Sequence, residues 1–170
     1  MKRRASVELH YLGFIRTPHR ELDRTPIQPC FARGVRGEIL LDPALAEGLK
    51  GIEEFTHLHL IYHLHRVEPG PLVVTPFMLD EPKGVFACRY PVRPNALGLS
   101  VVKLVGVEGC SLIVEDVDML DGTPLLDIKP FYPKLDVPEH AWGGWTERVD
   151  ADEAERRGRR RSVRTLPRSL

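Results

Sequence analysis

Two arginines and an asparagine stand close together in a proline-rich stretch near the middle of the chain. Arg89, Arg93 and Asn95 lie within RYPVRPN, whose two prolines exclude regular helix and central strand. The stretch therefore predicts a stiff loop that presents two guanidiniums and a side-chain amide. A guanidinium offers a planar fork of donors that suits a carboxylate or a phosphate. From residue types alone, a connector with solvated arginines is an equally good interpretation.

Histidines occupy four of the five alternate positions from 57 to 65 in HLHLIYHLHRV, residues 57–67. This strict alternation predicts a strand with its leucines and Tyr62 on the opposite face. Two histidines two positions apart can bind one metal ion, but no carboxylate or thiolate neighbours them in sequence. We therefore expect no metal and favour a polar face that lines a cleft or an interface. The predicted face contains His57, His59, Ile61, His63 and His65.

Three cysteines, with no CxxC spacing, indicate free thiols in a reducing compartment, and we expect a cytoplasmic protein. Cys88 adjoins Arg89, yet no histidine or acid is tied to it by sequence, so a nucleophilic role is not favoured. No apolar run is long enough for a bilayer, and no apolar segment follows the basic start, so no membrane association is expected.

Charge is distributed unevenly along the chain. The last 15 residues hold seven of the 24 basic residues and no acidic one, which leaves 17 basic against 24 acidic residues in the first 155. Three interpretations of the arginine-rich tail stay open: it is solvated, it docks on the acidic body of its own or a neighbouring subunit, or it contacts RNA phosphates. These arginines are Arg156, Arg157, Arg159, Arg160, Arg161, Arg164 and Arg168.

The elements that must position these residues are short strands. Seven or eight of them, separated by proline and glycine turns, predict a mainly β fold, either a barrel or a curled mixed sheet. Short helices are expected within residues 43–55, capped by Asp42 and ended by Gly51, and at 147–161. We expect a single barrel-like domain over residues 1–138 and a C-terminal extension over 139–170.

The first four expected strands are residues 7–18, 34–43, 57–67 and 70–79. Two apolar runs follow within residues 99–120, and their junction at Glu108 and Gly109 predicts a hairpin. The last strand follows the turn signal DGTP and ends at Pro130.

Five segments, in order, carry a resemblance to a known family. They are GFIRTP, PIQ, GIEEFTHLHLIYHLH, GVFACRYPVRPNALGLSVVKL and LDGTPLLDIKPFYP. Together they resemble the TsaA-like, or TrmO, family of S-adenosylmethionine-dependent methyltransferases, from about Leu12 to Asp136. The resemblance implies a β-barrel homodimer that binds the methyl donor near the subunit interface. It also implies methylation of threonylcarbamoyl-adenosine beside the anticodon of a tRNA.

Carried over by motif, the resemblance implies a donor site made of Pro26, Ile27, Gln28, His65, Arg66, Arg89, Leu99, Leu120, Asp121, Gly122 and Thr123. Arg89 is expected to pair with the donor carboxylate, and Asp121 to face its ammonium or a ribose hydroxyl. Substrate contacts are expected from Arg93, Asn95 and Lys129. Candidates for a base are the histidine face together with Asp127, Lys129 and Tyr132.

Two departures from the family pattern bear on the substrate. Ile27 stands where the PRQ loop of the family has arginine, and Cys88, Tyr90 and Ala96 differ from the usual central motif. Two hypotheses therefore stay open. The first is a methyltransferase acting on a modified tRNA adenosine or another small acceptor. The second is a non-catalytic or regulatory module that binds S-adenosylmethionine.

Overall fold

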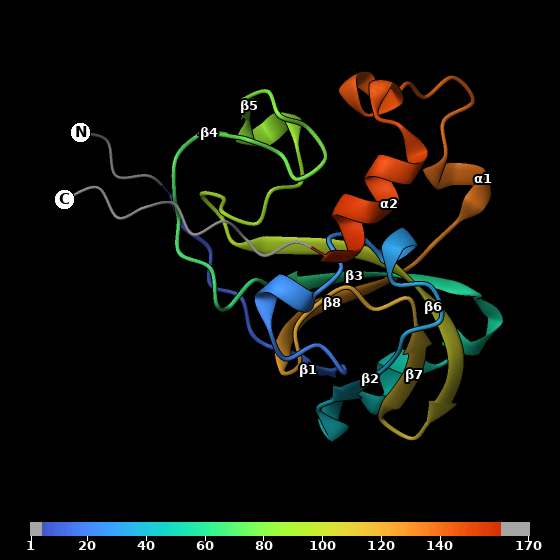
Figure 1. Ribbon diagram of the computed structural model, residues 1–170. Coiled ribbons are helices and arrows are strands. Elements are labelled where there is room, and N and C mark those ends of the chain that lie inside the picture. Colours follow the sequence, from blue (N-terminus) through green and yellow to red (C-terminus); the bar gives the residue numbers. More distant parts are fainter. Residues whose placement is uncertain (1–4, 161–170) are drawn as a thin grey trace.

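Six antiparallel strands close into a barrel in the computed structural model, which describes residues 5–160 (Figure 1). Around the barrel the order is β1-β2-β7-β6-β3-β8. The prediction of a mainly β, barrel-like fold is confirmed. The barrel strands are β1 (Gly13–Arg16), β2 (Arg36–Leu41), β3 (His57–His63), β6 (Leu97–Glu108), β7 (Ser111–Glu115) and β8 (Thr123–Pro130).

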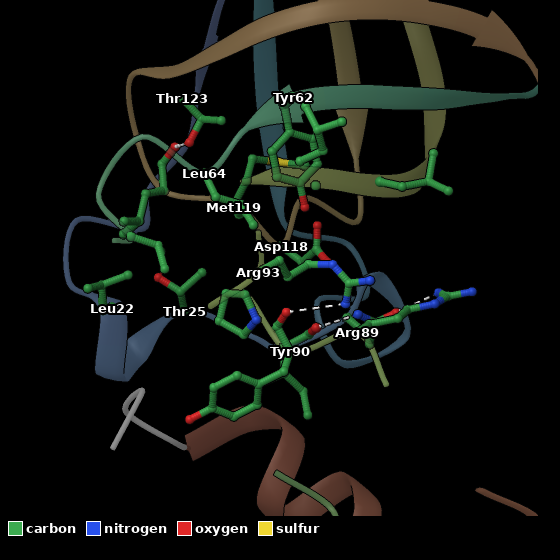
Figure 2. A pocket seen from close by; sticks show the side chains of 18 of the residues that line it. Leu22, Thr25, Tyr62, Leu64, Arg89, Tyr90, Arg93, Asp118, Met119 and Thr123 are labelled. Atoms are coloured by element: carbon green, nitrogen blue, oxygen red, sulfur yellow. Dashed lines mark hydrogen bonds between the residues drawn. The ribbon is translucent and has the colours of Figure 1, made fainter. Parts of the chain in front are cut away.

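Strand β3 has the predicted alternation. Leu58, Leu60 and Tyr62 are buried in the barrel, because every second side chain of a strand points to the same face. Tyr62 is the last of them and lies at the end of the barrel, near Thr123 (Figure 2). The strand ends at His63, so the expectation that it continues to residue 67 is wrong, and His65 lies beyond it. No group of three potential metal ligands occurs in residues 5–160.

Two other strand predictions differ in length, and the first, expected over residues 7–18, is reduced to β1 (Gly13–Arg16). The hairpin at Gly109 is confirmed, and this residue has the positive φ (61°) that a tight turn requires. The strand expected over residues 70–79 is reduced to β4 (Val73–Val74), which pairs with β5 (Lys83–Gly84) outside the barrel (Figure 1). Prolines on both sides of β4 remove backbone donors, which explains its shortness.

The helices are short. The segment expected to contain one helix, residues 43–55, forms two 3₁₀ turns, η3 (Pro43–Leu49) and η4 (Ile52–Glu54), separated by Gly51 at φ 84°. Asp42 caps the first as expected, since its Oδ1 accepts a hydrogen bond from the Ala44 amide at 2.9 Å. Among the described residues no helix has the length and apolar character to cross a membrane. The remaining helical elements are η1 (Leu22–Arg24), η2 (Pro29–Phe31), η5 (Val85–Ala87), α1 (Pro133–Asp136), η6 (Gly144–Arg148) and α2 (Ala151–Arg160).

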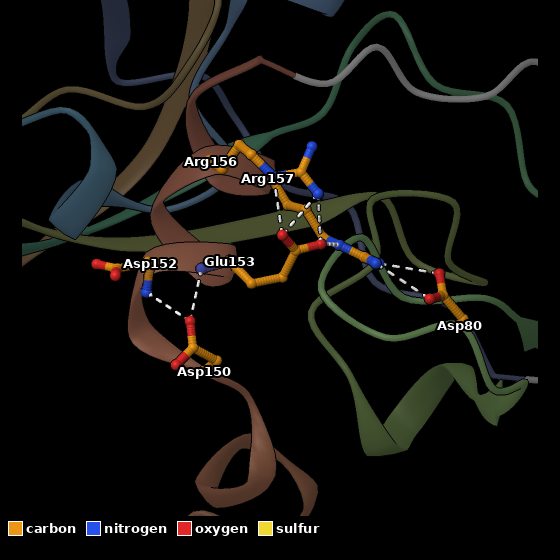
Figure 3. Close-up of polar contacts among 6 residues, drawn as sticks. All are labelled: Asp80, Asp150, Asp152, Glu153, Arg156 and Arg157. Atoms are coloured by element: carbon orange, nitrogen blue, oxygen red, sulfur yellow. Dashed lines mark hydrogen bonds and ion pairs between the residues drawn. The ribbon is translucent and has the colours of Figure 1, made fainter.

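Helix α2 docks on the body of its own chain (Figure 1). Its Arg157 donates to both carboxylate oxygens of Asp80, at 2.9 and 3.0 Å, and also pairs with Glu153 one turn earlier (Figure 3). The backbone carbonyl of the buried Gly158 accepts from the Ile27 amide at 3.1 Å. A side chain at Gly158 would collide with the ring of Phe31. The described part of the arginine-rich segment is therefore attached to the body; Arg161, Arg164 and Arg168 lie outside the described residues.

Because Arg157 is the ionic anchor of α2, we expect Arg157→Met to release the helix while the barrel keeps its stability. Backbone amides of residues 151–158 should then exchange hydrogen several-fold faster, measured by mass spectrometry, with an unchanged melting temperature for the barrel. Arg156→Met is the matched control, since Arg156 pairs within the helix with Glu153. Equal exchange rates in the two variants would contradict the anchoring role.

Candidate functional site

A cavity of about 410 Å³ opens at the end of the barrel where β3 ends (Figure 2). Four separate segments line it, namely residues 22–28, 62–67, 77–99 and 118–123. They include nine of the eleven residues expected to bind the methyl donor. These nine are Pro26, Ile27, Gln28, His65, Arg66, Arg89, Leu99, Leu120 and Thr123.

Asp121 and Gly122, the other two, shape the turn before β8 and do not line this cavity. The Asp121 carboxylate accepts from the Thr17 amide at 3.1 Å and pairs with Arg20 at 3.2 Å. It lines a second, more open hollow together with residues of β1 and β2. Gly122 has φ 74° and donates its amide to the Ile15 carbonyl at 2.9 Å. Both residues therefore fix the position of their neighbours Leu120 and Thr123.

Arg93 closes the central loop, residues 88–96, onto itself. Its Nη1 donates to the carbonyls of Val85 at 2.9 Å and Cys88 at 2.7 Å, and its guanidinium lies over the Phe86 ring. These bonds support the expectation of a stiff loop, in addition to its prolines. Arg93 lines the cavity, and its assignment as a substrate contact stays a prediction.

Arg89 links the central loop to the loop at Gln28. Its Nη1 donates to the Gln28 side-chain oxygen at 2.8 Å. Its other guanidinium donors have no partner among the described residues, so they are available to an anionic group in the cavity. Nearby, burial and the charge of Arg66 lower the pKa of His65, which keeps its imidazole neutral at pH 7.

Asp118 is a cavity residue that the sequence interpretation missed. It is 8% exposed, and its Oδ1 accepts a 2.6 Å hydrogen bond from the hydroxyl of Ser100. Ser100 is in turn 3.0 Å from the Tyr62 hydroxyl. Burial raises the pKa of Asp118 to about 7, against the opposing effect of the Ser100 bond. An acid between two apolar residues, Val117 and Met119, was the available signal in the sequence.

Of the residues expected to include a base, His65 lines the cavity, and Asp127, Lys129 and Tyr132 do not. Asp127 and Lys129 pair with each other at 2.8 Å on the outer face of β8, and neither lines the cavity. Tyr132 packs against the ring of Phe55, and Asn95 is also absent from the cavity lining. The catalytic assignment of Asp127, Lys129 and Tyr132, and the substrate role of Asn95, stay predictions.

The volume and the lining side chains of the cavity suit a small zwitterionic or cationic organic molecule. Its volume falls within the range of about 300–1,000 Å³ that is usual for such sites. Apolar side chains such as Leu64, Phe77 and Met119 form much of the wall. Arginine side chains and one buried acid supply charges of both signs. S-adenosylmethionine fits this description, since it combines a carboxylate, an ammonium, a sulfonium and an adenine ring.

Similar proteins were found at the levels of sequence and structure. A probable S-adenosyl-L-methionine-binding protein of Pyrococcus abyssi is 50% identical over 137 residues, which cover 81% of this chain and 74% of that protein. The tRNA (adenine(37)-N6)-methyltransferase of Escherichia coli is 32% identical over 159 residues, covering 88% of this chain and 68% of the relative.

The crystal structure of TrmO from Pseudomonas aeruginosa superimposes with a TM-score of 0.72 at 34% identity. The match covers 86% of this chain and 64% of the TrmO chain, so the present chain spans less than two thirds of that structure. The family model for the tRNA-methyltransferase O N-terminal domain matches residues 14–137, which include all six barrel strands but the first residue of β1. The chain therefore belongs to the TrmO family, as the carrier of its N-terminal domain.

Proposed function

We propose that this protein is an S-adenosylmethionine-dependent methyltransferase that acts on a tRNA adenosine, with threonylcarbamoyl-adenosine next to the anticodon as the acceptor. The observation that carries the proposal is the convergence of Pro26, His65, Arg89 and Leu120 on one cavity from four distant segments of the chain. Relatives named for S-adenosylmethionine binding and for methylation of adenine 37 of tRNA support it.

The residues of the cavity would hold and orient the donor. When bound, S-adenosylmethionine supplies an electrophilic methyl group on its sulfonium. The free donors of Arg89 suit its carboxylate, and the apolar walls suit its uncharged parts while they exclude water. Methyl transfer depends chiefly on alignment of the acceptor behind the methyl group, so a stiff loop at the cavity is of direct use.

Assembly into a homodimer belongs to the same proposal. Phe86, Leu97 and Leu99 line the cavity, yet they are 78, 43 and 51% exposed. Apolar side chains left uncovered at the rim of a site are typical of surfaces that a partner buries. A second copy placed there would complete the wall of the cavity.

The three cysteines are free thiols, which suits the reducing compartment in which we expect tRNA to be modified.

One observation favours a second candidate function. In the single chain, Asp127, Lys129 and Tyr132 lie outside the cavity lining, and His65 is the base candidate that lines it. A module that binds S-adenosylmethionine and regulates a partner needs the cavity but no acceptor site.

Arg89→Ala tests the donor site. We expect it to weaken S-adenosylmethionine binding by about 1.5–3 kcal/mol, as for the loss of a charged hydrogen bond, measured by titration calorimetry. Arg24→Ala is the control, because Arg24 lies beside the same loop, does not line the cavity and pairs with Glu21 on the surface. Unchanged affinity in Arg89→Ala would remove this residue from the donor site.

The two candidate functions separate in one assay. Purified protein is incubated with S-adenosylmethionine and with tRNA that carries threonylcarbamoyl-adenosine, and the digested nucleosides are analysed by mass spectrometry. A methyltransferase adds one methyl group to that nucleoside. Donor binding without methylation of this tRNA, under conditions in which the protein is dimeric, would favour the binding module.

A further inference from the structure

The methyl donor carries a net positive charge, and the cavity that would bind it is lined by several arginines. S-adenosylmethionine carries a sulfonium and an ammonium against one carboxylate, so its net charge is positive. Among the described residues that line the cavity, the cationic side chains are those of Arg66, Arg89 and Arg93, and Asp118 carries the sole carboxylate. A cationic ligand among guanidiniums requires an anionic contact, because burial of an unpaired charge is costly.

The acid that motif transfer had assigned to this task is occupied elsewhere. Both oxygens of Asp121 are engaged, with the Thr17 amide and with Arg20, and this side chain lines the second, more open hollow. Asp118 lies three residues earlier in the same segment and belongs to the donor cavity.

Asp118 is prepared for a ligand on one side only. Its Oδ1 is held at 2.6 Å by Ser100, which the Tyr62 hydroxyl contacts in turn, so the carboxyl group is fixed in orientation. Its own backbone amide also donates to the carboxylate, and Oδ2 accepts no hydrogen bond from another residue of the described chain. Figure 2 shows the carboxyl group beside the hydroxyl end of Tyr62, within the cavity. Ser100 thus anchors Oδ1, and Oδ2 has no partner from another residue and can accept a contact from a ligand.

We propose that Asp118 Oδ2 is the anionic contact for the positive charge of the methyl donor. This proposal rests on the proposed function, since it concerns the ligand of the same cavity. The group that Oδ2 contacts is cationic, and it is either the sulfonium or the ammonium of S-adenosylmethionine.

The proposal has a pH dependence whose sign follows from the surroundings of Asp118. The titratable groups that face it are Tyr62 from β3, Arg89 from the central loop and Cys30 from η2. Its pKa is raised to about 7, so in the free protein the carboxyl group is mostly neutral at pH 6 and mostly ionised at pH 8. A cation binds the ionised form, and donor affinity should therefore rise with pH across this range.

Titration calorimetry at pH 6.5 and 8 tests the proposal on the full chain. Asp118→Asn should weaken S-adenosylmethionine binding at pH 8 about tenfold or more, and should abolish the pH dependence seen in the wild type. Asp116→Asn is the matched control from the same segment, since its side-chain oxygen can still accept from the Gly34 amide and asparagine tolerates its positive φ of 69°. This control should bind as the wild type does.

S-adenosylhomocysteine keeps the ammonium and lacks the sulfonium charge, so its binding shows which of these two groups Asp118 contacts. Weakening of both ligands by Asp118→Asn assigns the contact to the ammonium, and weakening of S-adenosylmethionine alone assigns it to the sulfonium; either result supports the proposal. Wild-type affinity and wild-type pH dependence in Asp118→Asn overturn it. A wild-type protein that binds neither ligand overturns the proposed function, and this proposal with it.

Folding of the variant is checked separately. A buried carboxyl group with a raised pKa costs stability as pH rises from its unfolded pKa, near 4, to about 7, and asparagine removes that cost. Asp118→Asn should therefore melt no lower than the wild type at pH 8 without ligand. A loss of donor affinity in a variant that is at least as stable reports on the contact and not on the fold.

Discussion

Antiparallel closure of the barrel is the constraint on which the site depends. Because β1 pairs with β8, the end of β1 at Arg16 and the start of β8 at Thr123 lie at one end of the barrel. Because β3 pairs with β6, the end of β3 at His63 meets the start of β6 at Leu97 in the same way. The four segments that line the cavity leave or enter these strand ends. Pairing rules alone thus gather residues that are far apart in sequence.

Polar contacts then give the loops at this end a defined shape. Arg93 satisfies carbonyls of its own loop, Arg89 ties that loop to Gln28, and Asp121 ties the turn before β8 to Thr17. None of these bonds is part of a strand ladder, yet each replaces a contact with water for a backbone or side-chain group near the cavity. Both arginines of the central motif line the cavity. Nη1 of Arg93 donates to carbonyls of its own loop, and Nη1 of Arg89 donates to the Gln28 side chain.

Features that depend on local pattern were predictable from the sequence, and those that depend on tertiary pairing were not. The alternation of β3, the hairpin at Gly109 and the cap by Asp42 follow from neighbours in sequence. Nine of the eleven residues that the family motifs assigned to the donor site line the cavity. Asp118 and the pair of Arg157 with Asp80 escaped notice, because nothing local shows which acid a closed barrel will bury or which loop a distant helix will meet.

The hydrogen bond from the Ile27 amide to the Gly158 carbonyl connects a cavity loop to the C-terminal helix through main-chain atoms alone. Two equilibria, occupancy of the cavity and attachment of the helix, therefore share a structural element, and thermodynamic reciprocity applies to them. If a ligand in the cavity orders this loop, it also favours the attached helix, and detachment of the helix would then lower ligand affinity by the same factor. Because the bond involves no side chain of Ile27, a substitution at this position can change the ligand contacts of the cavity and still keep the bond to the helix.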